Sequence, residues 1–134
     1  YTYTVSSNDI TKTITFSGSA LEMPYITIAS ITDCSVNEGS SLSSNKVSAG
    51  SYKKYLKPGE SITFHAENNS SAGWGWWNNP TLTADNGVTI SESKGSRKEG
   101  SLFNTKIYYN NTFTITVKAD HITGEIKLTF KGGK

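Results

Sequence analysis

Apolar and polar residues alternate in segments that recur from one end of this chain to the other. Residues 10–16, 61–66, 112–118 and 125–131 each place apolar side chains on one parity and polar side chains on the other. Successive side chains of a strand point to opposite faces of its sheet, so this pattern predicts half-buried antiparallel strands. Shorter candidate strands cover residues 1–5, 25–36, 82–84, 88–90 and 102–109. In residues 25–31 the apolar side chains occupy both parities, which indicates a central strand covered on both faces.

Turn signals separate these segments. Lys57-Pro58-Gly59-Glu60 places Pro and Gly at the centre of a β-turn, and Asn86-Gly87 is the pair that favours a type I′ hairpin. Residues 37–45 and 92–101 are rich in Ser, Gly, Asn or charge, and we expect both to be loops. No segment has helical periodicity. About eight strands at this spacing predict an all-β fold, a single antiparallel β-sandwich. The length of 134 residues suits one domain, residues 1–134, with one core.

Composition narrows the function classes. Hydrophobic residues make up 34% and charged residues 18%, and the net charge is only +2. Nucleic-acid binding needs clustered Lys and Arg, so we expect no nucleic-acid partner. No apolar run approaches the roughly 20 residues that span a bilayer. A chain that starts at Tyr1 fits removal of an export signal or of a tag, and we expect a secreted protein.

Catalytic and metal-binding residues are sparse. The chain has one cysteine, Cys34, and two histidines, His65 and His121, far apart in sequence. The common zinc sites need four Cys or His ligands, so none is expected, and Cys34 is expected to be a small buried apolar residue. Carboxylates are scattered, and no nucleophile or phosphate-binding motif is present. We therefore predict a protein that is not an enzyme and holds neither cofactor nor metal.

The most informative segment is rich in tryptophan. Trp74, Trp76 and Trp77 are the only three tryptophans, and Gly and Asn residues flank them. Because a sandwich core takes its aromatic side chains from alternate strand positions, at least one of the three is expected to point outward. The plainer interpretation is that Trp74 and Trp76 fill the core while Trp77 covers a sheet edge. We favour a binding role, since indole suits the membrane interface and also stacks on sugar rings.

A wider candidate binding site surrounds these tryptophans. Asn78 follows them directly, and residues 73–79 are expected to make first contact with a surface. Tyr108 is the expected exposed member of a second aromatic and polar patch, whereas Tyr109 has the apolar parity of its strand. Lys53 and Lys54 would supply a modest attraction to lipid headgroups.

The middle of the chain resembles the aegerolysins. The resemblance is carried by small residues and one turn: Val47-Ser48-Ala49, Tyr52, Lys57-Pro58, Glu60, Ala66 and Ser71-Ala72-Gly73, followed by the strand Thr81-Leu82-Thr83-Ala84. The closing Thr123-Gly124 turn and the strand with Ile126, Leu128 and Phe130 are also similar. The resemblance implies a small β-sandwich that recognises membrane lipids, and a larger pore-forming protein as partner. Residues 73–77 and 100–103 depart from the family, so its lipid specificity is not carried over.

Three functions follow from these features. The first is a toxin-like protein that binds membrane lipid through the tryptophans, as one part of a pore-forming pair. The second is a carbohydrate-binding module that uses the same tryptophans to bind a glycan surface. The third is a structural subunit of a surface assembly, in which residues 1–5 pair with the sheet edge of a neighbouring copy. The sequence leaves the oligomeric state open.

Overall fold

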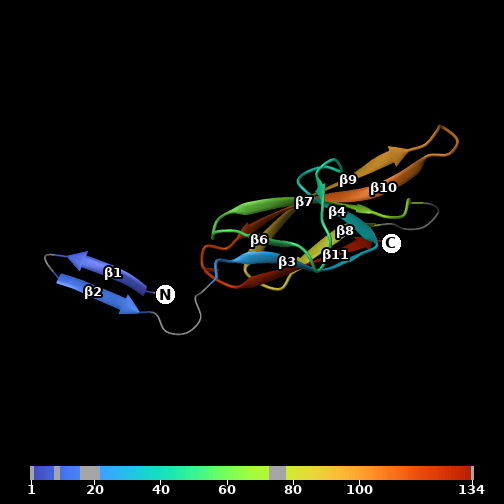
Figure 1. Ribbon diagram of the computed structural model, residues 1–134. Coiled ribbons are helices and arrows are strands. Elements are labelled where there is room, and N and C mark those ends of the chain that lie inside the picture. Colours follow the sequence, from blue (N-terminus) through green and yellow to red (C-terminus); the bar gives the residue numbers. More distant parts are fainter. Residues whose placement is uncertain (1, 8–9, 16–21, 73–77, 134) are drawn as a thin grey trace.

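The protein is a β-sandwich, as the alternation predicts. The computed structural model describes residues 2–7, 10–15, 22–72 and 78–133, and these contain strands and no helix. Figure 1 shows two layers of strands facing each other, with the C-terminal end of the chain at one end of the sandwich. One sheet has five strands and the other has four.

The five-stranded sheet has the order β5-β4-β7-β10-β9. All of its pairings are antiparallel. Its strands in chain order are β4 (Cys34–Glu38), β5 (Asn45–Lys46), β7 (Ser61–Asn68), β9 (Val88–Glu99) and β10 (Lys106–Val117). The β9–β10 pair forms a long ribbon whose turn end extends past the rest of the sandwich (Figure 1).

The four-stranded sheet has the order β6-β3-β11-β8. Its strands are β3 (Tyr25–Thr32), β6 (Lys53–Tyr55), β8 (Asn78–Ala84) and β11 (Glu125–Gly133). The pairing of β3 with β11 is parallel, which the local pattern does not reveal. Residues 25–36 form two strands rather than one, because the chain turns at Asp33, where φ is 58°, and passes from one sheet to the other. β3 alternates buried Ile26 and Ile28 with more exposed residues, so it is half-buried rather than covered on both faces.

Two further strands near the N-terminus form a sheet of their own. β1 (Thr2–Ser7) pairs antiparallel with β2 (Ile10–Thr15). In Figure 1 this hairpin lies outside the sandwich, whose strands run from β3 to β11.

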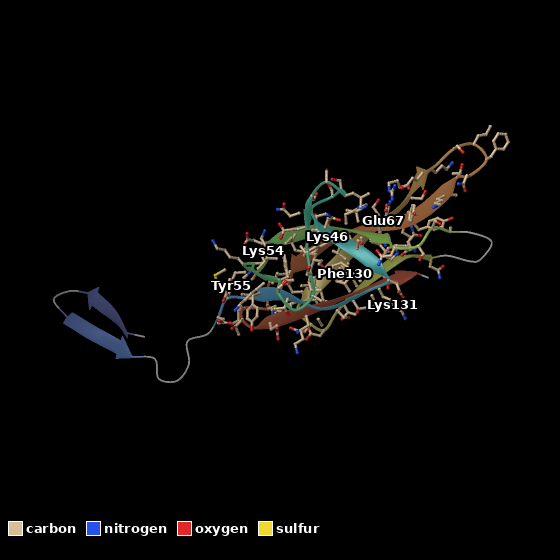
Figure 2. The ribbon with its side chains drawn as sticks, turned by 45° about the vertical axis from the view of Figure 1, so that its right-hand side comes forward. Lys46, Lys54, Tyr55, Glu67, Phe130 and Lys131 are labelled. Carbon is tan, nitrogen blue, oxygen red and sulfur yellow. The ribbon has the colours of Figure 1, made fainter. Side chains whose placement is uncertain are left out.

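The core lies between the two sheets and takes its side chains from the predicted parity. Phe64 from β7, Phe113 from β10 and Phe130 from β11 are fully buried. The rings of Phe64 and Phe113 each pack edge-on against Phe130, with centroids 5.5 and 6.1 Å apart. Figure 2 shows Phe130 in the middle of the sandwich, between the labelled residues at its two ends. Such buried aromatic side chains dominate the energetics of a small core.

Two further local predictions are wrong. Residues 92–99 are not a loop but the second half of β9, paired with β10 as far as Glu99 opposite Lys106. This half is polar because both of its faces meet solvent, so no apolar alternation marks it as a strand. Asn86-Gly87 does not close a hairpin either: it connects β8 in one sheet to β9 in the other, with Gly87 at a φ of 75°.

Candidate functional site

Trp74, Trp76 and Trp77, the centre of the predicted site, lie outside the described residues. The residues that flank them are described. On one side, the backbone N–H of Ala72 donates to the carbonyl of Ile107 on β10, with an N–O distance of 2.6 Å. On the other side, the exposed Asn78 opens β8 opposite Gly133. Ala72 and Asn78, which flank the tryptophan-rich segment in the sequence, therefore lie beside β10 and beside the end of β11.

The turn of the β9–β10 ribbon carries the most exposed large apolar side chains of the described chain. Leu102 is 88% exposed and Phe103 is 95% exposed. The turn itself is ordered by hydrogen bonds to the carbonyl of Ser101 from the N–H of Asn104 (3.0 Å) and the hydroxyl of Thr105 (2.8 Å). Sequence reasoning missed this apolar tip, because residues 102–109 are expected to be one strand whereas β10 begins at Lys106.

A polar cluster on the outer face of the five-stranded sheet holds the base of this ribbon. The guanidinium of Arg97 on β9 reaches across β10 to the carboxylate of Glu67 on β7, with N–O distances of 2.8 to 3.2 Å. Glu67 is buried, and it also accepts a hydrogen bond from Asn110 at 3.4 Å. Arg97 donates to Glu99 as well, at 2.8 Å. These contacts join three strands where the ribbon leaves the sandwich.

The charges of this cluster stabilise one another. Hydrogen bonds to Glu67, and secondarily to Glu99, hold the pKa of Arg97 above its usual value. Hydrogen bonding from Arg97 lowers the pKa of Glu99. The Arg97 side chain is 37% exposed, so solvent screens the pair, and losing Arg97 costs less than the roughly 3–5 kcal/mol of a fully buried pair. The cluster is thus a rigid support for the tip, and nothing in the local sequence indicates that residues thirty positions apart would meet.

Tyr108, predicted as the exposed member of its pair, lies on the outer face of the ribbon. Its ring packs under the guanidinium of Arg97, 4.7 Å from the ring centroid to the guanidinium carbon. Tyr108 and Tyr109 are both half-buried, and Tyr109 shares the parity of the core residue Phe113. One face of the Tyr108 ring is therefore already occupied by Arg97.

Lys53 and Lys54 lie at the other end of the sandwich. Strand β11 gives a common scale for the distance. Lys53 pairs with Thr27 on β3, and Thr27 pairs with Lys127 on β11. Asn78 pairs with Gly133, at the other end of β11. Six residues of strand between Lys127 and Gly133 span about 20 Å. Figure 2 shows Lys54 and Tyr55 toward one end of the sandwich and Glu67 toward the other. The structure does not bring these two lysines together with Asn78 or Tyr108.

Both lysines have partners where they are. The ammonium group of Lys53 lies over the rings of Tyr25 and Tyr55, 4.4 and 5.0 Å from their centroids. Lys54 forms an ion pair with Glu38 at 3.5 Å. Lys53 also lies 3.9 Å from a carboxylate oxygen of Glu22. Exposed ion pairs of this kind contribute little to stability, and the carboxylates partly offset the charge of both lysines.

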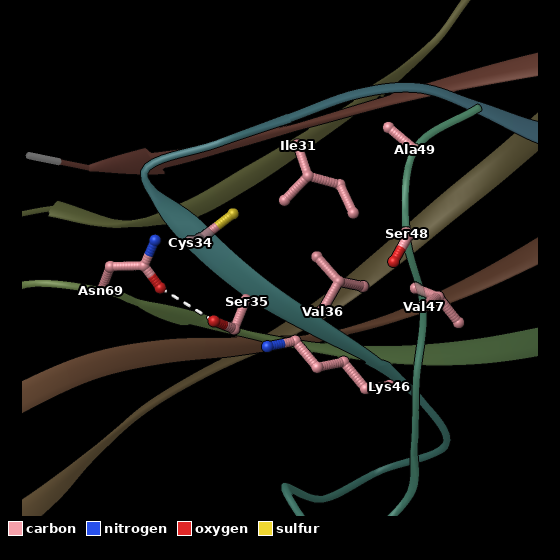
Figure 3. Close-up of a pocket in the computed structure, with 9 residues that line it drawn as sticks. All are labelled: Ile31, Cys34, Ser35, Val36, Lys46, Val47, Ser48, Ala49 and Asn69. Carbon is pink, nitrogen blue, oxygen red and sulfur yellow. Dashed lines mark hydrogen bonds between the residues drawn. The ribbon is translucent and has the colours of Figure 1, made fainter. Parts of the chain in front are cut away.

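A pocket of about 320 Å³ lies beside β4, walled by residues of β3, β4 and the segment 46–49. Figure 3 shows the Cys34 thiol and the side chains of Ile31 and Val36 at this pocket, with the hydroxyl of Ser35 bonded to Asn69. Burial, and then the charge of Asp33, raises the pKa of Cys34 to about 11. The thiol is therefore neutral at physiological pH and a poor nucleophile, since the thiolate is the reactive form.

Metal ligands do not gather in the described part of the chain, which holds no group of three or more His, Cys, Asp or Glu side chains that could bind an ion. His65 and His121 are separated: His65 contacts Thr112 on β10, and His121 lies against Gly87. The same described residues contain no helix that is long and apolar enough to span a membrane. Comparison with protein-family models, with curated proteins and with solved structures found no match.

Proposed function

We propose that this protein is a secreted, toxin-like, non-enzymatic protein that binds membrane lipid through the β9–β10 turn, together with the tryptophans that the sequence singles out. The observation that carries this proposal is the exposure of Leu102 and Phe103, 88% and 95%, at a tip that extends past the sandwich. A turn needs no apolar residues for its own folding. Two adjacent large ones in water are typical of a surface that is buried in a complex.

Burial of this tip in a bilayer would be favourable. Fully burying a Leu or Phe side chain contributes about 1.5–3 kcal/mol. The tryptophans would add to this contact, since the indole ring is suited to the level of the lipid headgroups. Ala72, which precedes them closely in the sequence, pairs with Ile107, four residues along the chain from Phe103.

Basic residues at the base of the tip favour an anionic membrane. Lys98 lies opposite Ile107, and Lys106 lies opposite Glu99. Each Lys near an anionic surface contributes about 1 kcal/mol to binding. Glu99 and Glu67 are engaged by Arg97, so the acidic residues of this region present reduced negative charge to the membrane. The resemblance to aegerolysins adds a larger pore-forming protein as the partner that would act after lipid binding.

Co-sedimentation with vesicles tests the proposal. The double substitution Leu102→Ser, Phe103→Ser should reduce binding to vesicles of phosphatidylcholine and phosphatidylserine by about 100-fold or more, because two apolar side chains no longer enter the bilayer. Ile122→Ser is the matched control, since Ile122 is 67% exposed but lies in the connection between β10 and β11 at the opposite end. Unchanged binding by the double variant would overturn the proposed contact.

A glycan surface is the alternative ligand, and the same preparation separates the two. Trp76→Ala should lower vesicle binding, and free sugars should leave that binding unchanged. Retention on an insoluble polysaccharide together with no binding to any vesicle would favour the carbohydrate-binding function instead. Stacking on a sugar needs a free aromatic face. Arg97 already covers one face of Tyr108, which favours lipid over glycan for the described part of the site.

A further inference from the structure

The four sheet edges of the sandwich are unequal. An edge strand exposes unpaired N–H and C=O groups, and proteins protect such edges by making them short, by placing Pro in them or by adding charge. Three of the edges are protected in the first two ways. β5 has two residues, β6 has three, and β8 contains Pro80.

The fourth edge, β9, has neither form of protection. It is a continuous strand of twelve residues without Pro, it pairs with β10 in an unbroken register, and β10 is its one neighbour in the sheet among the described residues. In an antiparallel strand, alternate residues direct both backbone groups to the same side. Along β9, every second residue therefore directs its N–H and C=O away from β10, toward the open edge.

The remaining form of protection is charge. The charged residues of β9, however, can complement those of β9 in a second copy of the chain. Glu92 and Lys94 both have the parity of the core residue Ile90 and lie on the same face of the sheet. When β9 pairs antiparallel with β9 of a second copy around an axis at Ser93, Glu92 of each copy lies opposite Lys94 of the other. A register centred one residue along, on Lys94, places the two Lys94 side chains opposite each other, which is unfavourable. The charges of Glu92 and Lys94 thus favour the register centred on Ser93 over the register centred on Lys94, which pairs β9 to the same extent.

We propose that β9 is a self-association edge, at which two copies of this chain pair antiparallel through residues 88–98 with Ser93 at the two-fold axis. The two five-stranded sheets would then join into one continuous sheet, with the inner faces of both copies on the same side. This pairing satisfies the open backbone groups of both copies. It also places two Glu92–Lys94 pairs across the axis, where they would replace the 3.7 Å ion pair that these two side chains form within each copy. It does not depend on lipid binding, since Leu102 and Phe103 lie beyond the paired strand.

Sedimentation of the full chain over a range of concentrations provides the first test. We expect a reversible monomer–dimer equilibrium. Lys94→Glu should weaken the dimer about tenfold, because each Glu92 then lies opposite a second carboxylate at two symmetric positions. Lys98→Glu is the matched control: it changes the net charge equally, but Lys98 lies opposite Val88 in this register and should have a much smaller effect. A monomer at every concentration, or equal effects of the two variants, would overturn the proposal.

Cross-linking tests the register independently of affinity. In Ser93→Cys, the two introduced thiols lie directly opposite each other across the axis, where the Cβ atoms of a cross-strand pair are close enough for a disulfide. Air oxidation should therefore give a covalent dimer. Ser91→Cys places the same thiol on the same face of β9, but opposite Gly95 of the second copy, and should remain monomeric in denaturing gels. Cross-linking of Ser91→Cys as readily as of Ser93→Cys would contradict the register.

Discussion

The two halves of the β9–β10 ribbon are stabilised by different interactions. In the half over the sandwich, Phe113, Ile115 and Val117 of β10 are buried in the core and Ile90 of β9 packs against it. In the half beyond the sandwich, the side chains are polar or exposed, and Arg97, Glu67 and Glu99 join the strands. A strand can therefore extend past the hydrophobic core when an ion pair with a buried carboxylate stabilises it at the point where it leaves the core.

The largest effect should come from the core half. Phe113→Ala removes a fully buried ring and should lower the free energy of unfolding by about 4 kcal/mol, because both apolar transfer energy and packing are lost. Urea denaturation measures this. Phe103→Ala is the control in the other half, and its 95% exposed ring should leave stability within about 0.5 kcal/mol of the parent protein.

Arg97→Ala should have the next largest effect, about 1–2 kcal/mol, because Glu67 remains buried without its partially solvent-screened partner. Amide hydrogen exchange should also rise selectively in residues 94–110, where the ribbon leaves the sandwich. The adjacent Lys98→Ala should change neither measurement. If Arg97→Ala behaves like Lys98→Ala, the polar half of the ribbon is held by its backbone ladder alone.

The smallest effect is a dependence on pH at the boundary between the halves. Burial lowers the pKa of His65, and the charge of Glu67 opposes this shift. A lowered pKa in the folded state means that the unfolded chain binds the proton more tightly. The stabilising contribution is therefore complete above the unfolded value of about 6.5 and is lost as the pH falls through the lower folded value. The free energy of unfolding, measured at a series of pH values, should depend less on pH in His65→Gln than in the parent protein. An unchanged dependence would assign it to another titrating group.

Alternation predicted the core well, because it reports burial directly. The parity that contains Phe64, Phe113 and Phe130 is the buried one, and the sandwich follows from strands of this kind. Where burial is absent, the same signal disappears. The second half of β9 has the geometry of a strand but no apolar side, so it resembles a loop in sequence.

The candidate site was harder to predict because its parts meet only after folding. The contact between Glu67 and Arg97, and the parallel pairing of β3 with β11, join residues that are distant along the chain. Lys53 and Lys54 illustrate the converse. They are closer to the tryptophans in sequence than Arg97 or Lys98 is to Glu67, yet strand direction carries them to the opposite end of the sandwich.

The single buried cysteine also allows the stability of the protein to be measured by thiol labelling. The Cys34 thiol is shielded in the folded protein, with its pKa raised to about 11. Its low exposure and raised pKa make labelling through the pocket beside β4 slow, and labelling becomes fast once the strands around it separate. Because the chain has no other cysteine, the labelling rate under native conditions measures the free energy of that opening without denaturant, dye or engineered probe. Every substitution that leaves Cys34 in place can be ranked on this one scale.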